Sequence, residues 1–371
     1  MKRIFTFTPV SFTSDQQFWC RDTGLISRTL RKLGVESKCI MPLPWHDNDD
    51  DKDHVVRATY EQLLDADWWR SLELDQVVIY TWANPRYTPM VRAIRRAGVQ
   101  IMMHLDRSAT LFRPWDNSLF FAVNLYYRLK DTVLNLLRNQ QMLLADVITL
   151  SQPVADVHLK SWCFSSRLKE KIRIFPCPVA SHFIYENQTK EERVVCVGRW
   201  SDNEIDKVKR PEFLRSVAEC FVEQDSRGIF EIYGTYGPAM SAWYDSLNPE
   251  KKSRILLKGR IPNEKLPEIY QHAMVSICPS RSESTHIASA EAMNCGASIV
   301  TSCRKSLVVL HWYIAMGAGA IAEEDTPESF ARAIHAELDC WRRGERNPQT
   351  ISTCFNNLFH VDKALPRILG L

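Results

Sequence analysis

Glycine is scarce in this 371-residue chain, at 13 residues, and no apolar run approaches the roughly 18 residues of a membrane-spanning helix. The scarcity of glycine excludes collagen-like and glycine-rich repeats. The apolar N-terminal stretch, MKRIFTFTPVSF, lacks a small-residue cleavage site, so it predicts a first buried strand and not a signal peptide. With 45% apolar and 25% charged residues the composition is that of a globular chain, and we expect a cytoplasmic protein of two domains.

The eleven cysteines include no C-x-x-C pair, which speaks against a zinc knuckle or a dithiol redox site. Several stand in apolar, strand-like runs, where free cysteine packs as a small hydrophobic side chain. Their odd number and dispersal fit a reducing compartment. The net charge of +3 is too close to balance to predict a nucleic-acid partner.

Apolar runs alternate with amphipathic stretches along almost the whole sequence. The runs predict strands at Ile4–Phe7, Ser37–Met41, Gln76–Tyr80, Gln100–His104, Val147–Leu150, Arg193–Val197, Ile229–Tyr233, Ile255–Lys258, Met274–Cys278 and Ser298–Thr301. Because parallel strands need crossover connections, the alternation indicates parallel sheets with helices on both faces. The expected fold class is α/β, with two Rossmann-like doubly wound domains.

The domain boundary is marked by Pro176, Pro178 and the polar stretch ENQTKEE that follows. We divide the chain into an N-terminal Rossmann-like domain at 1–180, a C-terminal Rossmann-like domain at 181–355 and a terminal helix at 356–371. That helix must pack against another surface, and the N-terminal domain is the candidate.

The segment of the second half with the most candidate ligand-binding residues is CPSRSESTHIASAEAMNCGASIV at 278–300, where a strand leads through a polar loop into a helix. Ligands of open α/β sheets bind beyond the carboxyl ends of the strands, at such loops. Glu283 and Glu291 have the spacing E-x7-E, and the N–H groups of the helix start at 286–288 would bind an anion. The two acids could accept hydrogen bonds from sugar hydroxyls, although acids near a helix start are common and E-x7-E alone is a weak signal.

A second strand end carries a group of cations. Gly198 and Arg199 end the strand VVCVG, and Lys207, Lys209 and Arg210 follow before the next helix. Arginine and lysine bind phosphate oxygens, so the group could hold a phosphorylated ligand. A solvated charge cluster would have the same composition.

Two further loops are candidates for ligand contact. Gly234 and Gly237 in EIYGTYGPAM would let a ligand approach the backbone closely, or would simply form a tight turn. After the strand that ends near Gly259, the backbone of Arg260 and Ile261 could face a base.

These loops, in this order and at this spacing, resemble the donor-binding half of the GT-B glycosyltransferases of family 4. The matching segments are Gly198-Arg199, Lys209–Pro211, Gly234–Pro238, Gly259–Tyr270 and Glu283–Val300. The resemblance covers roughly residues 193–335, and the first half matches in layout alone. It implies the GT-B fold, in which two Rossmann-like domains face each other across a cleft.

The resemblance also implies roles for single residues. Arg199 and Lys209 would neutralise the donor diphosphate, with Lys207 as a competing candidate; Glu291 would hold the ribose and Glu283 the sugar hydroxyls. The remaining donor contacts that it implies are Gly198, Gly234, Arg260, Ile261, His286, Ile287 and Ala288.

One departure from the family pattern falls within the E-x7-E segment. The family usually has E-G-F-G at the first acid, whereas Ser284, Thr285 and His286 follow Glu283 here. The loss of both glycines narrows access to the backbone, and His286 could contribute a hydrogen-bond donor of its own.

In the first half, His104 and Asp106 come after the apolar run QIMM, where the family often carries a His-Asp pair near the reacting sugar. The intervening Leu105 leaves open which of the two takes that place, and a core histidine at a strand end is an equal alternative for His104. The catalytic candidates are thus His104, Asp106, Arg199, Lys209 and Glu283.

The family implies a retaining reaction by front-face attack, in which cations and a helix N-terminus replace a metal ion. Asp-x-Asp pairs, the usual metal-binding pattern, occur at Asp47–Asp49, Asp49–Asp51 and Asp65–Asp67. The first two stand in the acidic run at 46–54, which predicts a surface loop, so we expect no metal and no cofactor beyond the nucleotide-sugar co-substrate.

The expected donor is a UDP-sugar, with glucose as the expected hexose. The acceptor would be a saccharide or a lipid-linked saccharide in polysaccharide or cell-envelope glycoconjugate assembly. A GT-B nucleotide-sugar epimerase and a non-catalytic sugar-nucleotide-binding module are the alternatives. The amphipathic stretch Leu125–Leu144 could contact the inner face of a membrane, although an interior helix with basic side chains reaching to solvent is the favoured interpretation.

Overall fold

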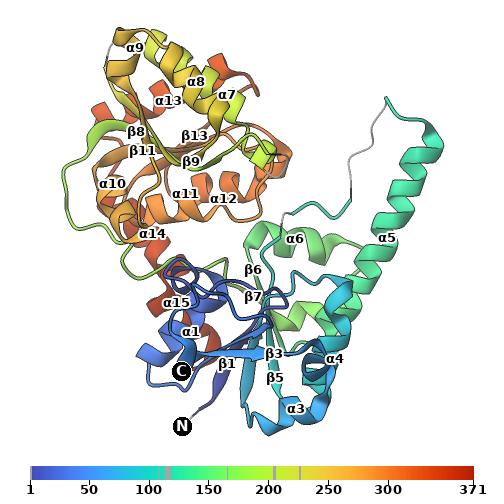
Figure 1. The fold of residues 1–371 in the computed structure, drawn as a ribbon. Helices are drawn as coiled ribbons and strands as arrows, with labels where there is room; N and C mark the ends of the chain where they lie inside the picture. Colours follow the sequence, from blue (N-terminus) through green and yellow to red (C-terminus); the bar gives the residue numbers. More distant parts are fainter. Residues whose placement is uncertain (1, 108, 113–117, 165, 204–205, 225–226) are drawn as a thin grey trace. The chain divides into compact units, whose positions relative to one another are not determined.

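The computed structural model describes residues 2–107, 109–112, 118–164, 166–203, 206–224 and 227–371 (Figure 1). The chain divides into two compact units: unit 1 is Met1–Pro178 with Ala364–Leu371, and unit 2 is Val179–Lys363. Each unit is a parallel sheet with its own helices, so the expected α/β class with two Rossmann-like domains is confirmed.

In the described part of unit 1, seven parallel strands pair in the order β3-β2-β1-β4-β5-β6-β7. Their bounds are β1 Ile4–Phe7, β2 Cys39–Pro42, β3 Val55–Ala58, β4 Gln76–Ile79, β5 Gln100–His104, β6 Val147–Leu150 and β7 Ile172–Ile174. The order reverses between β1 and β4, which is the topological switch point of a doubly wound sheet.

The helices of unit 1 connect these strands. They are α1 Asp22–Lys32, α2 Tyr60–Leu64, α3 Ala66–Ser71, α4 Thr88–Arg96, α5 Phe121–Leu143 and α6 Gln152–Lys160. The C-terminal helix α15, Val361–Leu369, contributes its residues from Ala364 onward to this unit.

Across the described residues of unit 2, six parallel strands pair in the order β10-β9-β8-β11-β12-β13, so the switch point falls between β8 and β11. Their bounds are β8 Glu191–Trp200, β9 Ile229–Tyr236, β10 Ile255–Gly259, β11 Ala273–Cys278, β12 Ser298–Thr301 and β13 Gly319–Ile321. The central strands are buried on both faces, as β8 shows with fully buried Val194, Val195 and Cys196.

The helices of unit 2 are α7 Pro211–Gln224, α8 Pro238–Ser246, α9 Pro249–Arg254, α10 Leu266–His272, α11 Ile287–Asn294, α12 Val308–Met316, α13 Pro327–Arg342 and α14 Pro348–Phe359. Several of them begin at proline, whose fixed φ and missing N–H suit the first helical position. The stretch 356–371 is not one terminal helix. Helix α14 ends at Phe359 and α15 begins at Val361, because His360 between them has extended backbone with φ −64° and ψ 118°.

The strands that the sequence pattern missed are β3, β7 and β13, which stand at sheet edges and have three or four residues each. Their half-exposed side chains provide no continuous apolar run. Strands β8 and β9 are longer than predicted, because Gly198 pairs with Gly234 and Trp200 with Tyr236. The segment around Gly234 is consequently the end of a strand and not a turn.

Helix α5 overturns the interpretation of an interior helix with an apolar face packed inward. Its buried residues are mostly polar: Asn135 donates to Leu111 O at 2.9 Å, and Gln141 donates to Asn84 O at 2.7 Å. Its exposed side chains are mostly apolar, and the large ones are Phe121 69%, Leu125 43%, Tyr126 58%, Leu129 59%, Val133 56%, Leu136 42% and Leu137 41%. The helix is long and extends past the sheet of its unit (Figure 1).

The acidic run at 46–54 is likewise not a simple surface loop, because Asp49 is buried within it. Both carboxylate oxygens of Asp49 lie 2.9 Å from Arg57 Nη2, and the backbone N–H groups of Ser14 and His46 donate to them at 2.8 Å. These hydrogen bonds outweigh burial, which by itself favours the neutral acid, and lower the pKa of Asp49 to about 2.

Candidate active site

The segments that leave β8 and β11 meet at the switch point of unit 2. The segment after β8 carries Lys209, and the segment after β11 carries Glu283. Arg281 N donates to Val208 O at 2.8 Å, and this backbone hydrogen bond joins the two segments. Open α/β sheets bind their ligands at this position, so the chain places two oppositely charged side chains where a ligand is expected.

Lys209 and Glu283 form a mostly buried ion pair. Lys209 Nζ lies 2.6 Å from Glu283 Oε1, and the two side chains are 19% and 11% exposed. Burial alone would raise the pKa of Glu283, but the charge and the hydrogen bond of Lys209 lower it below the ordinary value. Glu283 is therefore ionised at neutral pH and fixed in position by a charged partner.

His286 caps the N-terminus of α11 in a left-handed conformation, with φ 49° and ψ 73°. The family pattern has glycine here, and glycine adopts this conformation without steric cost. The substitution therefore preserves the backbone path and adds an imidazole. His286 Nδ1 lies 2.7 Å from Ser289 Oγ, and burial lowers the pKa of His286 to about 4, so the ring is neutral at neutral pH.

Helix α11 begins at Ile287, directly after His286. The first N–H groups that bond back to His286 O are those of Ser289 and Ala290, at 3.0 and 3.4 Å. The N–H groups of Ile287 and Ala288 precede these bonds and carry the positive end of the helix dipole. They can bind an anion, as the sequence predicts for this helix start.

Glu291 lies in the same helix, one turn after Ile287, and is 2% exposed. The preceding loop is fixed from α12, because the hydroxyl of Tyr313 donates to Thr285 O at 2.7 Å. The E-x7-E spacing therefore places one acid in a fixed loop and the other on the helix that follows.

The other predicted cations have different environments. Arg199 and Lys207 are exposed, Arg199 near the end of β8. Arg210 has a structural role, because its Nη1 lies 2.6 Å from Asp325 Oδ1 and its guanidinium lies 3.6 Å from the ring centre of Phe213. Lys209 is thus the buried cation at the switch point.

Arg260 and Ile261 follow β10, an edge strand two positions from β8. Arg260 is exposed and Ile261 half-buried. With strands about 4.8 Å apart, they lie on the order of 10 Å from β8 across the sheet. That distance suits the opposite end of an extended ligand, and their role against a base stays a prediction.

Close packing within the sheet leaves no room for a side chain at Gly198 or Gly234. A Cβ on Gly234, whose φ is +117°, would lie 1.7 Å from Gly198 O, and a Cβ on Gly198 would lie 2.6 Å from the buried ring of Trp200. Close packing within the sheet explains both residues, and their contact with a donor stays a prediction.

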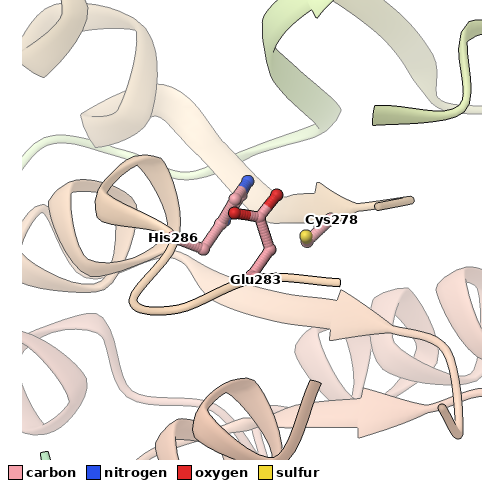
Figure 2. Close-up of side chains that lie close together, drawn as sticks. All are labelled: Cys278, Glu283 and His286. Carbon is pink, nitrogen blue, oxygen red and sulfur yellow. The ribbon is translucent and has the colours of Figure 1, made fainter. Parts of the chain in front are cut away.

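Cys278, Glu283 and His286 form a cluster that the sequence interpretation missed (Figure 2). One ligand atom from each of the three lies within 4.8 Å of the others. We interpreted Cys278 from its apolar run as a core residue, and it is fully buried. The spacing C-x4-E-x2-H at a strand end was the available signal.

In unit 1, His104 belongs to the core. It is 1% exposed, its Nδ1 lies 2.9 Å from Thr149 Oγ1 and its Nε2 lies 3.3 Å from Cys177 Sγ. Its ring stacks on Tyr80 at 4.5 Å between centres, and burial lowers the pKa of His104 to about 3. Both nitrogens contact the core, so the geometry supports the structural alternative for His104.

Asp106 follows β5 and is partly exposed, which favours it over His104 as the residue near a reacting sugar. Asp22 is a second acid near it, at the start of α1. Burial and the charge of Asp106 raise the pKa of Asp22 to about 6. The sequence interpretation missed Asp22, because nothing in its local pattern relates it to β5.

Four of the five carboxylates of the Asp-x-Asp pairs have protein partners. Asp49 binds Arg57, Asp51 Oδ2 lies 3.1 Å from Arg31, Asp65 accepts from the N–H of Asp67 at 2.9 Å, and Asp67 pairs with Arg70. Among the described residues, no helix combines the length and the apolar character that spanning a bilayer requires.

Two doubly wound units in succession, with paired charges at the switch point of the second, define the GT-B class of fold. Solved structures of this class match over nearly the whole chain. Sucrose-phosphate synthase from Thermosynechococcus elongatus matches with a TM-score of 0.65 and 14% identity, covering 100% of this chain and 98% of that one. Anabaena Alr3699/HepE in complex with UDP-glucose has values of 0.64, 13%, 99% and 98%. The lipopolysaccharide outer core galactosyltransferase WaaB has 0.62, 12%, 99% and 99%.

Residues 191–339 match the family model described as Glycosyl transferases group 1. The predicted resemblance to GT-B glycosyltransferases is therefore confirmed. No curated protein sequence matches the chain significantly.

Proposed function

We propose that this protein is a retaining, metal-independent glycosyltransferase that moves a hexose, with glucose expected, from a UDP-sugar to a saccharide or lipid-linked acceptor. The glycosyltransferase class rests on the family model. The finer assignment rests on one observation: the buried ion pair between Lys209 and Glu283 at the switch point of unit 2.

Each partner of this ion pair has a role in donor binding. Lys209 supplies a positive charge for the diphosphate, and Glu283 accepts hydrogen bonds from the sugar hydroxyls. The N–H groups of Ile287 and Ala288 bind a phosphate oxygen at the positive end of α11. Glu291 holds the ribose, and Arg199 lies at the exposed end of β8 as a second cation for the diphosphate.

These groups also stabilise the transition state. When the bond between the sugar and the diphosphate breaks, negative charge grows on the diphosphate oxygen, and fixed positive groups act without reorganisation. The acceptor hydroxyl attacks from the side that the diphosphate leaves and gives its proton to the diphosphate oxygen. The anomeric configuration is thereby retained, and Lys209 supplies the charge that a metal ion would otherwise provide.

The substrates are proposed from the solved neighbours. HepE was crystallised with UDP and with UDP-glucose, and Staphylococcus aureus TarM with UDP and a GlcNAc-glycerol, while WaaB is named for lipopolysaccharide. These names support a UDP-sugar donor and an acceptor from cell-envelope or polysaccharide assembly. A cytoplasmic location fits such a donor.

The left-handed backbone of His286 bears on the non-catalytic alternative. The replaced glycines were the feature that favoured loss of turnover. Because His286 adopts the conformation that glycine would adopt, the replacement at 286 leaves the backbone path into α11 undisturbed. The replaced glycine at 286 therefore gives no reason to expect a loss of turnover, and catalysis stays the proposal.

A thermal-shift series tests the donor. The protein is heated with UDP, GDP, ADP and their glucose conjugates, and UDP-glucose should raise the melting temperature most, because a ligand of the folded state stabilises it by mass action. Product analysis then separates the enzyme classes, since a glycoside supports transfer and a free epimer supports the epimerase. Equal melting temperatures with every nucleotide would contradict the proposed donor site.

The exposed face of α5 supports a further part of the proposal, contact with an anionic membrane surface. Leu129 and Val133 are exposed on this face, and the exposed charged side chains that the structure describes on α5, Arg128 and Lys130, are both basic. An apolar helical face bordered by cations is the pattern of an interfacial helix. Such a contact would bring the enzyme to a lipid-linked acceptor.

Vesicle co-sedimentation tests this contact. Binding to phosphatidylglycerol vesicles should exceed binding to phosphatidylcholine vesicles, and Leu129→Glu should reduce it about tenfold, because it places a charge in the apolar face. Leu64→Glu, at an exposed leucine of α2, is the matched control. Equal binding of both variants, or a dimer in light scattering that Leu129→Glu dissociates, would contradict membrane contact.

A further inference from the structure

The cluster of Cys278, Glu283 and His286 has the donor set of a transition-metal site. A thiol, a carboxylate and an imidazole converge at the end of β11 and the start of α11 (Figure 2), with their ligand atoms within 4.8 Å of one another. In tetrahedral zinc sites, with bonds of about 2.0–2.3 Å, ligand atoms lie about 3.5 Å apart. Side-chain rotations that close the cluster by about 1 Å would complete three corners of such a site.

The imidazole is oriented for this purpose. Histidine ligands of metals usually bond through their second ring nitrogen to a protein group, which fixes the ring and its tautomer. His286 Nδ1 contacts Ser289 Oγ at 2.7 Å, which leaves Nε2 as the nitrogen available to a metal ion. The residue that replaces the family's glycine is the one that supplies the nitrogen ligand.

Entry to the cluster is from the side of Glu283. Cys278 is fully buried, whereas Glu283 keeps 11% of its side chain exposed. An ion that binds Glu283 must displace Lys209 Nζ, now 2.6 Å away, and the Cys278 thiol must lose its proton to solvent to become a thiolate ligand. A borderline-soft ion gains enough from thiolate and imidazole bonds to offset these costs, whereas Mg²⁺, which prefers oxygen ligands, does not.

We infer that Cys278, Glu283 and His286 form a binding site for Zn²⁺ or a similar divalent transition-metal ion, with the fourth position open to water. The site goes beyond the proposed function, because the ion binds the protein without nucleotide. A consequence that does rest on the proposed function is that zinc and the sugar nucleotide exclude each other, since both require Glu283 and the metal displaces Lys209.

Cobalt is the spectroscopic probe for the thiolate. The nucleotide-free, reduced protein is titrated with Co²⁺ in a non-chelating buffer, and we expect a thiolate-to-cobalt charge-transfer band that saturates at one equivalent and disappears when Zn²⁺ is added. Cys278→Ser should abolish the band. Cys303→Ser, at an exposed cysteine after β12, is the matched control and should retain it.

Two variants at α11 avoid a failure to fold. His286→Gly suits the left-handed backbone and removes the nitrogen ligand, so it should fold and bind Zn²⁺ at least about tenfold more weakly in competition with a chromophoric chelator. Ser289→Ala tests the positioning contact and should weaken zinc binding about tenfold while leaving its stoichiometry unchanged. Circular dichroism checks each fold.

The outcomes separate this inference from the proposed function. A band that persists in Cys278→Ser, zinc affinity that is unchanged in His286→Gly, or no saturable binding would overturn the metal site. If zinc binds as expected but UDP-glucose neither binds nor competes with it, the metal site stands and the proposed donor site fails.

Discussion

The two units have the same strand order around their switch points, yet their candidate site residues lie at different strand ends and in different surroundings. In unit 2, Lys209 and Glu283 come from separate segments, and their charges stay partly exposed. In unit 1, both ring nitrogens of His104 contact the core, at Thr149 and Cys177. The two groups differ in position as well as in partners: Lys209 and Glu283 follow the two strands of the switch point in unit 2, whereas His104 ends β5, one strand beyond the β1–β4 switch point of unit 1.

The two histidines sharpen this contrast. Burial lowers the pKa of both His104 and His286, so both rings are neutral at neutral pH. His104 contacts protein through both nitrogens, whereas His286 contacts Ser289 through Nδ1. A shifted pKa therefore does not by itself separate a core histidine from a site histidine, and the contacts of the second nitrogen do.

The largest effect is expected at Lys209. Lys209→Ala should lower kcat about 10²-fold or more and change the donor KM much less, because the diphosphate gains charge in the transition state. Steady-state kinetics with varied donor measure both constants. Lys207→Ala, at an exposed neighbour, is the control and should stay close to the parent; equal losses in the two variants, or a Lys209 loss confined to KM, would refute the assignment.

Glu291 should affect binding and not turnover. Glu291→Ala should weaken nucleotide binding by about 1–3 kcal/mol, because ribose hydroxyls lose their acceptor in a site where Glu291 is 2% exposed. Calorimetric titration with UDP measures the change. Asp106→Ala, in unit 1, should leave UDP affinity unchanged, and an unaltered affinity in Glu291→Ala would remove this residue from the site.

The buried histidines should make stability depend on pH. Their folded pKa values, about 3 for His104 and about 4 for His286, lie below the ordinary 6.5, so between these values the unfolded chain binds protons that the folded chain does not. Stability from each neutral ring is complete above about pH 6.5 and falls by up to about 1.4 kcal/mol per pH unit as the pH drops towards the folded pKa.

Urea unfolding from pH 7 to 5 measures this slope. His104→Asn should reduce the slope of stability against pH for unit 1, and His286→Asn should reduce it for unit 2. An extrinsic fluorescent label attached to one unit at a time reports the unfolding of each unit separately. A slope that neither variant changes would show that other groups control the acid response.

The smallest expected effect is that of a chelator. Activity should survive EDTA, because Lys209 replaces a catalytic metal. In samples that carry zinc at Cys278 and His286, EDTA should raise the activity, because it removes an ion that competes with the donor. An activity assay before and after dialysis against EDTA, with manganese added back, checks this. Loss with EDTA and rescue by manganese would instead indicate a catalytic metal.

Much of the fold could be predicted because its signals are local. Four predicted strands, Ile4–Phe7, Gln100–His104, Val147–Leu150 and Ser298–Thr301, have the observed bounds, since each is an apolar run between polar segments. Helix α7 begins at Pro211, directly after Arg210, as the sequence predicts for the helix that follows this group of cations. The edge strands were missed because half-exposed runs of three or four residues carry no such pattern.

The site could be predicted in part for the same reason. The order of the loops placed Lys209, Glu283 and Glu291 in one family pattern, and the strand order puts their segments at one switch point. The structural interpretation of His104 rests on its contact with Cys177, which is 73 residues away in sequence. The buried Asp49 was missed because its partner Arg57 neutralises an acidic run that composition assigns to solvent.

The sequence by itself determined the alternation of strands and helices, the position of the boundary near residue 180 and the family pattern of the second half, because these depend on residue type and spacing along the chain. The tertiary structure decided which polar side chains find hydrogen-bond or ion-pair partners and which side chains stay exposed. It directed the polar side of α5 inward and its apolar side to solvent, gave Gly234 a packing role against Gly198, and brought Cys278 to Glu283 and His286. Such outcomes depend on contacts between distant segments, and the free energy of a buried polar group is set by the partner that it meets there.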